Sequence, residues 1–225
     1  MESWARISWQ SFSVNAAAAI RVVLVHGLWM NGVAMLPLGW RLSRCGFDVV
    51  RFSYASLRDG LEHNADLLAS LCREQGTAPL HLVGHSLGGL LILAALERNR
   101  DLKVQRAVLI GSPYAGNTAA VGLARSAIGE KMLGRTMNDW MRMPRPSIPD
   151  GVELGVIAGS VPFGLGRLVA RLPKPNDGVV RVEETHVPGA KDSIVLRINH
   201  TGMLVSPAVA RAACAFLRNG SFRRA

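Results

Sequence analysis

The 225-residue sequence contains only three cysteines, and their placement excludes the common cysteine-based architectures. Cys45, Cys72 and Cys214 are odd in number, lie far apart and form no C-x-x-C pair. This spacing argues against a disulfide framework and against a zinc site. We therefore expect each cysteine to be a small buried apolar side chain.

Long apolar runs are also missing. The longest one, from about Leu87 to Leu96, is far too short to span a bilayer. Arg21 interrupts the apolar stretch that begins at Val14, so no signal peptide is expected. With 49% hydrophobic and 19% charged residues and a mean hydropathy of +0.20, the composition is that of a globular protein. The sequence predicts a cytoplasmic protein in which residues 1–225 form one domain.

Acidic residues are scarce, since 16 Asp and Glu stand against 26 Lys and Arg, and the net charge is +10. Such an excess favours anionic partners such as nucleic acid or lipid headgroups. The basic residues are nevertheless scattered, with small clusters at 98–100 and 223–224, and no basic stripe is interleaved with aromatic residues. We expect a solvated basic surface, no specific nucleic-acid partner, and at most a weak association with an anionic membrane surface.

What the sequence does contain is an alternation of short apolar runs and longer helix-compatible stretches. The runs are rich in Val, Ile and Leu, as in strands buried on both faces. Strands are predicted at 21–27, 48–54, 80–86, 106–113, 153–160 and 193–199, with helices at 33–45, 61–75, 87–99 and 206–219. This alternation predicts a mostly parallel, doubly wound sheet flanked by helices. An additional edge strand is expected at 7–12.

Residues 116–150 break this rhythm because they are too long for a simple crossover and contain no predicted strand. On a helix, Leu133, Met137, Trp140 and Met141 would share one face. Two interpretations are open: this face packs on the sheet, or it is the inner surface of a small lid. In the second case, Met137, Trp140 and Met141 would contact an apolar substrate.

The stretch "GHSLG" at 84–88 is a G-x-S-x-G motif. A predicted strand leads into it and a predicted helix leaves it, which is the context that a nucleophile elbow requires. Small flanking residues allow strand and helix to approach each other while the serine projects from a strained turn. The motif therefore predicts Ser86 as a catalytic nucleophile.

A serine hydroxyl needs a base, and the base needs a group to orient it. His200 follows the last predicted strand, where catalytic groups of parallel sheets gather. His85 adjoins the serine, but on such a turn we expect it to point away and to take no part in the chemistry. The remaining histidines lie in less suitable places: His26, His63, His81 and His186.

The orienting acid is expected between Ser86 and His200 in the chain. Asp177 follows the predicted strand 153–160 and is our candidate, although N-D-G is also a strong turn signal. Asp192 and Asp150 lie at the wrong ends of their strands.

Acyl transfer also requires backbone donors for an oxyanion. The N–H of Leu87, directly after the serine, is one candidate, and the N–H of Leu28 in the loop "HGLWMNG" is the other, with Trp29 as an addition. Trp29 and Met30 would then form a wall of an acyl pocket, or simply pack.

The motifs "HGLW", "GHSLGG", "NDGVV" and "NHTGML" occur in the order seen in α/β-hydrolases, and the chain resembles the small bacterial esterases and lipases of that superfamily. The resemblance covers about residues 20 to 217. It implies an α/β-hydrolase fold with a short lid-like insertion at 116–150, and Ser86, Asp177 and His200 as a catalytic triad. It also implies Leu28 and Leu87 as oxyanion donors, and no metal or organic cofactor.

This resemblance implies a serine hydrolase that cleaves a small-molecule acyl ester or thioester through an acyl-enzyme. Thioesterase and acyltransferase activities use the same residues, and a non-catalytic binding protein is the alternative outside enzymes. The departures from exported lipases are the short lid region and the lack of a secretion signal and of a disulfide. They favour an intracellular esterase or thioesterase.

Overall fold

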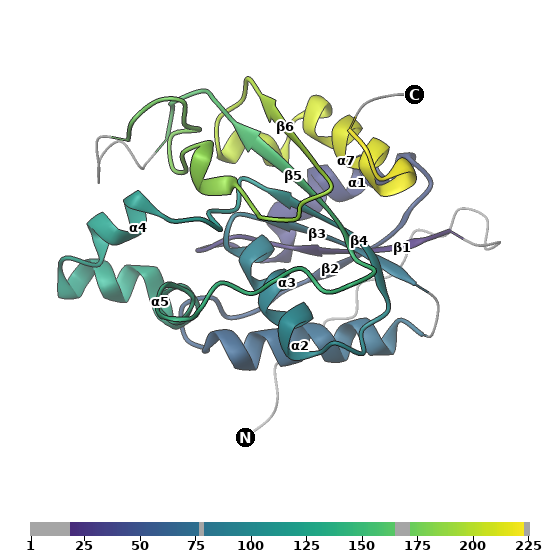
Figure 1. The fold of residues 1–225 in the computed structure, drawn as a ribbon, viewed down its shortest axis with the longest axis horizontal. Coiled ribbons are helices and arrows are strands. Elements are labelled where there is room, and N and C mark those ends of the chain that lie inside the picture. Colours follow the sequence, from purple (N-terminus) through teal and green to yellow (C-terminus); the bar gives the residue numbers. More distant parts are fainter. Residues whose placement is uncertain (1–18, 77–78, 165–171, 223–225) are drawn as a thin grey trace.

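The structure is a computed structural model that describes residues 19–76, 79–164 and 172–222. The edge strand expected at 7–12 and the basic pair at 223–224 lie outside the described residues. Six parallel strands form one sheet in the order β2-β1-β3-β4-β5-β6 (Figure 1). The strands are β1 Arg21–Val25, β2 Asp48–Phe52, β3 Leu80–His85, β4 Val104–Ile110, β5 Glu153–Gly159 and β6 Asp192–Leu196. All six predicted strands and the parallel sheet are confirmed.

Helices cover both faces of the sheet. On one face, α2 (Leu61–Glu74) packs against α3 (Leu87–Arg98), and on the other α1 (Leu36–Arg44) packs against α7 (Pro207–Asn219) (Figure 1). The four predicted helices are thereby confirmed. Three short 3₁₀ helices complete these connections: η1 Gly32–Met35, η2 Glu183–Thr185 and η3 Thr201–Leu204.

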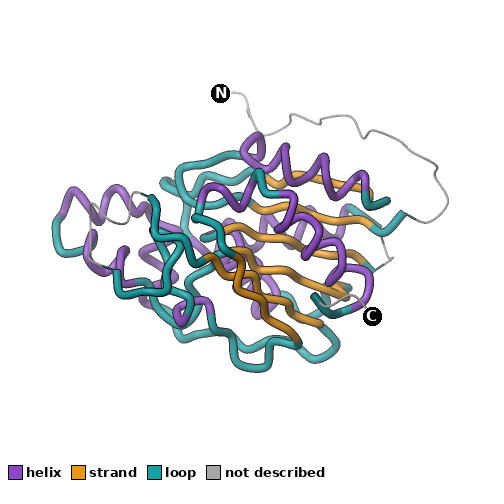
Figure 2. The backbone as a smooth tube through the Cα atoms, turned by 90° about the horizontal axis from the view of Figure 1, so that it is seen from above, coloured by secondary structure: helices purple, strands orange, loops and turns teal. Residues whose placement is uncertain are grey.

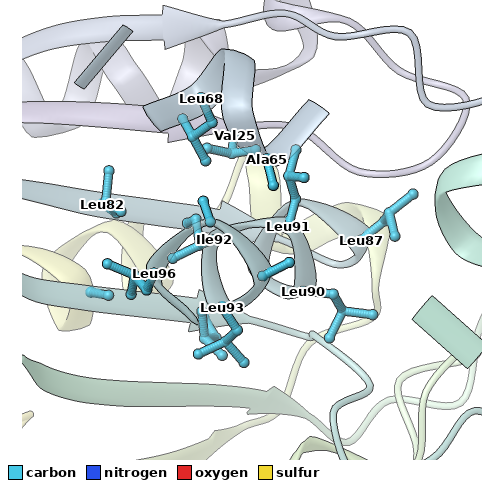
Figure 3. Close-up of a cluster of buried hydrophobic side chains, with 14 of the residues drawn as sticks. Val25, Ala65, Leu68, Leu82, Leu87, Leu90, Leu91, Ile92, Leu93 and Leu96 are labelled. Atoms are coloured by element: carbon cyan, nitrogen blue, oxygen red, sulfur yellow. The ribbon is translucent and has the colours of Figure 1, made fainter. Parts of the chain in front are cut away.

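Two apolar clusters fill the layers between the sheet and the helices. The larger one surrounds α3, whose first ten residues are all buried against β3 and α2 (Figure 3). The smaller one lies under α1 and α7. Strands buried on both faces explain the near-continuous Val, Ile and Leu runs, and Val22, Val23, Leu24 and Val25 of β1 have no exposed surface. None of the described helices combines the length and apolar character needed to cross a membrane.

The insertion contains α4 (Thr118–Leu123) and α5 (Ala127–Arg142), which lie beyond the carboxyl ends of the strands (Figures 1 and 2). Helix α5 packs on α2 rather than on the sheet. Asp139 of α5 caps the first turn of α2, because its Oδ2 accepts the N–H of Leu61 at 3.0 Å. Such a tertiary cap could not be read from the spacing of apolar residues.

Of the two interpretations of this face of α5, its contacts favour the one in which the face packs on the protein. Met137 and Trp140 are buried in the same apolar cluster as α2 and α3, and Met141 packs against that cluster while half-buried. The apolar side chains that α5 exposes are Ile128 and Met132 instead. The helical periodicity was correct, but it did not distinguish a face that packs on the protein from one that contacts a substrate.

The expectation that all three cysteines are unpaired is wrong, because Cys45 and Cys214 form a disulfide. Cys45 directly follows α1, and Cys214 lies in α7. The topology places these two helices side by side on one face of the sheet, although 169 residues separate the cysteines in sequence. Cys72 is free and buried, as expected.

His81 in β3 is fully buried, and it makes the stability of the fold sensitive to acid. Burial, reinforced by the positive charge of Arg106, lowers its pKa from 6.5 to about 4. Between these two values the unfolded chain binds the proton and the folded chain does not. The free energy of unfolding should therefore fall as the pH drops from 6.5 toward 4, by at most about 1.4 kcal/mol per pH unit.

Urea unfolding of the wild-type protein and of His81→Leu at pH 7 and at pH 5 measures this effect. The variant should lose less stability between the two pH values than the wild-type protein. It should retain some pH dependence, because burial also lowers the pKa of His26 and of His85. An identical pH dependence in the two proteins would contradict this role of His81.

Candidate active site

Ser86 lies between β3 and α3 in a backbone conformation that side chains rarely adopt, with φ +53° and ψ −121°. Its N–H donates to the carbonyl of Ile110 at the end of β4 over 2.8 Å. Gly88 permits this turn, since a Cβ there would lie 2.3 Å from the carbonyl oxygen of Val25. This strained strand-to-helix turn has the geometry of a nucleophile elbow, in agreement with the interpretation of the motif.

Asp177 and His200 lie in the loops that follow β5 and β6, and they contact each other. The Nδ1 atom of His200 lies 2.7 Å from Oδ2 of Asp177, and the N–H of His200 donates to the backbone carbonyl of Asp177 over 2.9 Å. Both side chains are buried, with exposed fractions of 8% for His200 and 1% for Asp177. Because Asp177 occupies Nδ1, Nε2 is the ring nitrogen of His200 that remains for another partner.

The carboxylate of Asp177 is itself held in place. Its Oδ1 accepts the N–H groups of Val179 and Val180 at 2.9 and 2.7 Å, so a tight turn orients Oδ2 toward the imidazole. Asp177 is therefore both the turn residue that the N-D-G sequence indicates and the carboxylate that contacts His200. Asp192 lies at the amino end of β6, where its Oδ2 accepts the N–H of Phe222 at 2.7 Å.

Gly111 makes room for this pair. It has φ +59°, and a Cβ at this position would lie 3.2 Å from Nδ1 of His200 and 3.3 Å from Oδ2 of Asp177. Gly111 follows Ile110, whose carbonyl accepts the N–H of Ser86. The Ser86 turn and the His200–Asp177 pair thus meet around the end of β4. The glycine was present in the predicted strand 106–113, but nothing in the sequence marked its close approach to the pair.

His85 also contacts His200, which sequence reasoning missed. Its Nε2 lies 3.1 Å from the carbonyl oxygen of His200, and the two rings are 4.8 Å apart. Complete burial, and next the neighbouring imidazole of His200, lower the pKa of His85 to about 3, so the ring is neutral. A carbonyl oxygen only accepts hydrogen bonds, so Nε2 carries the proton. His85 therefore supports the loop of His200 from the residue adjacent to Ser86.

The loop after β1 lies against the serine. A Cβ on Gly27 would be 3.2 Å from the Cβ of Ser86. The backbone N–H of Tyr54 donates to Nε2 of His26 over 3.2 Å, so Nδ1 of His26 carries the proton and donates to the Gly27 carbonyl at 2.8 Å. In a trans peptide the C=O and N–H groups point in opposite directions. Holding the Gly27 carbonyl toward His26 therefore turns the N–H of Leu28 away from it.

Leu87 is the first residue of α3, so its N–H belongs to the first-turn amides that have no carbonyl partner within the helix. The two predicted pocket residues contact different elements. Trp29, with φ +60°, donates from Nε1 to the carbonyl of Met132 in α5 over 2.7 Å, whereas Met30 packs against the cluster under α1 and α7. The wall of an acyl pocket that these two residues would form stays a prediction.

A hollow of about 460 Å³ lies beside the acid loop. Glu184 joins its two sides, since Oε1 accepts the N–H of Thr118 at 2.7 Å and Oε2 accepts the N–H of Arg181 at 2.9 Å. The loop that carries Asp177 is thereby attached to the start of α4. Within the described part of the chain, no group of three or more His, Cys, Asp or Glu residues could hold a metal ion.

The sheet order, the elbow at Ser86 and the buried acid–base pair are those of an α/β-hydrolase. A sequence model of the α/β-hydrolase family matches residues 22–219, and the chain belongs to this family. No curated protein is similar enough in sequence to match this chain.

Solved structures share the fold at low sequence identity. The mature form of the Bacillus licheniformis lipase BlEst2 is 18% identical, covers 94% of this chain and 97% of its own, and has a TM-score of 0.70. A metagenomic carboxyl esterase, MGS0156, is also 18% identical over 89% of this chain and 69% of its own, with a TM-score of 0.65. The carboxylesterase CesB of Bacillus subtilis is 16% identical, with coverages of 94% and 92% and a TM-score of 0.58. The fold is that of bacterial esterases and lipases, as the sequence predicts.

Proposed function

We propose that this hydrolase cleaves carboxylic esters through an acyl-enzyme formed on Ser86. The observation that carries the proposal is the buried pair His200–Asp177, with 2.7 Å between Nδ1 and Oδ2, at the end of the sheet where Ser86 occupies its strained turn. The names of the similar structures, a lipase and two esterases, support an ester as the substrate.

In this mechanism Nε2 of His200 takes the proton of the Ser86 hydroxyl as its oxygen attacks the ester carbonyl. Asp177 keeps the Nδ1–H of His200 oriented and stabilises the imidazolium that forms. The backbone N–H groups of Leu28 and Leu87 donate to the oxyanion, and His26 orients the first of them through the Gly27 carbonyl. His200 then protonates the leaving alcohol, and afterwards it activates a water molecule that releases the acid.

A panel of p-nitrophenyl esters, acyl thioesters and anilides of graded chain length tests the substrate class. The proposal predicts the highest kcat/KM for an ester. A higher value for the matching thioester would overturn the ester assignment in favour of a thioesterase that uses the same residues. Failure of an active-site fluorophosphonate probe to label Ser86 would contradict the nucleophile itself.

Asp177→Asn should lower kcat/KM for the best ester by roughly a hundredfold or more, because an amide cannot hold the imidazole in the required tautomer or stabilise its charge. The matched control is Asp192→Asn, which makes the same chemical change at the opposite end of β6. The control should keep its activity, although an amide has one acceptor oxygen in place of two, so it cannot keep the bonds to the N–H groups of both Ser193 and Phe222 and its stability should fall. If instead Asp192→Asn loses activity and Asp177→Asn does not, the assignment of the acid is wrong.

The disulfide bears on where the enzyme works. Disulfides persist in oxidising compartments and are rare in the cytosol of most organisms. The Cys45–Cys214 pair therefore favours an oxidising compartment over the cytoplasm that the sequence predicted. The lack of a disulfide is therefore no longer a difference between this chain and exported lipases.

A further inference from the structure

An exposed apolar surface lies next to the loop that carries Leu28. It consists of four side chains, which we call the α5 surface: Trp29, Leu57, Ile128 and Met132, with exposed fractions of 49%, 43%, 74% and 46%. Single exposed apolar residues are common, but a contiguous group of large ones marks an interaction site.

Contacts of α5 with the neighbouring loops connect these four residues. Trp29 reaches the backbone of Met132 through the 2.7 Å hydrogen bond from Nε1. Helix α5 is kinked at Gly134, which has φ +68° and ψ 174°. Leu57 lies against this kink, and its carbonyl accepts the N–H of Arg135 at 3.0 Å. Ile128 and Met132 are four residues apart on α5 and therefore share one side of the helix. The surface thus spans α5 and the loops after β1 and β2.

Cations predominate around this surface, with the half-buried Asp59 as the acidic residue of the Leu57 loop. Arg58, Lys131 and Arg135 are exposed, and no ion pair joins any of them to an acidic group among the described residues. The two acidic residues of α5 are engaged elsewhere, since Glu130 pairs with Arg142 at 2.7 Å and Asp139 caps α2. The apolar centre is therefore bordered by unpaired cations.

We propose that the α5 surface docks on an anionic lipid surface. Exposed apolar side chains with a tryptophan among them enter the headgroup region, while neighbouring lysines and arginines attract anionic headgroups. Each cation near such a surface adds roughly 1 kcal/mol of attraction. The docking itself does not require catalysis. If the proposed function holds, it also brings the Leu28 loop and Ser86 close to lipid-borne esters.

A second exposed apolar group, on η1 and α1, fits this partner less well. It contains Val33, Leu36 and Trp40. The guanidinium groups of Arg41 and Arg44 lie over the Trp40 ring, 5.6 and 5.0 Å from its centre. The two guanidinium groups therefore make cation–π contacts with the exposed ring. The cations of the α5 surface have no such partner within the described chain.

Cosedimentation of the full chain carrying Ser86→Ala measures binding without turnover. Vesicles of phosphatidylcholine with phosphatidylglycerol should bind it at least tenfold more tightly than vesicles of phosphatidylcholine alone, and added salt should weaken the binding. The substitution Lys131→Glu, and separately Ile128→Asp, should each weaken it at least tenfold. The matched controls are Arg211→Glu on α7 and Leu67→Asp on α2, both at exposed positions, and they should bind as tightly as the parent.

Equal binding to the neutral vesicles would overturn the proposal, as would a loss of binding in Trp40→Ala with none in Ile128→Asp. A dimer in sedimentation velocity that Ile128→Asp dissociates would also overturn it, because the surface would then join two copies of the chain. In a chain that retains Ser86, Ile128→Asp should hydrolyse dissolved p-nitrophenyl acetate at the rate of the wild-type protein. A chain that binds anionic vesicles but hydrolyses no ester would contradict the proposed function and leave the docking intact.

Discussion

Ser86→Ala is expected to lower kcat for the best ester by on the order of 10⁴- to 10⁶-fold. Without the hydroxyl no acyl-enzyme can form, and what remains is the contribution of the backbone donors and of substrate binding. The fold should be retained, because alanine keeps the Cβ that the turn already accommodates. The free energy of unfolding should change by less than about 1 kcal/mol.

The matched control is Ser112→Ala, the same chemical change at a buried serine beside the end of β4. The Ser112 hydroxyl has no hydrogen-bond partner among the described residues, so its removal should affect neither activity nor stability to any large extent. Turnover by Ser86→Ala at the parent rate would overturn the nucleophile assignment. So would fluorophosphonate labelling that persists in this variant.

Breaking the Cys45–Cys214 disulfide should lower the free energy of unfolding by up to about 5 kcal/mol. The cross-link closes a loop of 169 residues and thereby removes much of the conformational entropy of the unfolded chain. It also ties α1 to α7, the two helices that cover one face of the sheet. A loss of this size is a large part of the total stability of an ordinary domain.

Urea unfolding with and without reductant measures the loss, with the double variant Cys45→Ala/Cys214→Ala as reference. Reductant should shift the midpoint of the wild-type protein toward that of the double variant and leave the double variant itself unchanged. Cys72→Ala controls for removal of a buried sulfur that closes no loop, and it should keep its sensitivity to reductant. A wild-type midpoint that reductant does not move would contradict this account.

The sheet could be predicted because parallel strands buried on both faces require continuous Val, Ile and Leu runs, such as Val22 to Val25. The candidate site was predictable for a related reason, since carboxyl ends of parallel strands meet at one edge. Ser86, Asp177 and His200 each follow a strand, and the structure places them around that edge. Each of these signals is local in the sequence. The order of the strands in the sheet is then enough to place the residues close together.

The features that escaped prediction depend on contacts between distant segments. Cys45 and Cys214 are adjacent only because α1 and α7 cover the same face of the sheet, and Asp139 meets Leu61 only because α5 packs on α2. The contact of His85 with the loop of His200 also escaped prediction, because a position beside Ser86 gives no information about that distant loop. Composition and spacing carry no record of such pairings.

The burial of α3 has a consequence for hydrogen exchange. Its first ten residues are buried against β3, α2 and the rest of the larger apolar cluster, so we expect local fluctuations to expose few of the amides that are hydrogen-bonded within this helix. Their exchange with solvent deuterium therefore requires unfolding of the whole sheet, whereas the amides of α5 can exchange through smaller fluctuations. The amides of Leu91 to Leu96, which are hydrogen-bonded within the helix, should be among the last to exchange. The turn that presents Ser86 is thus attached to a helix that we expect to exchange slowly, and it should keep its shape while the surrounding surface moves.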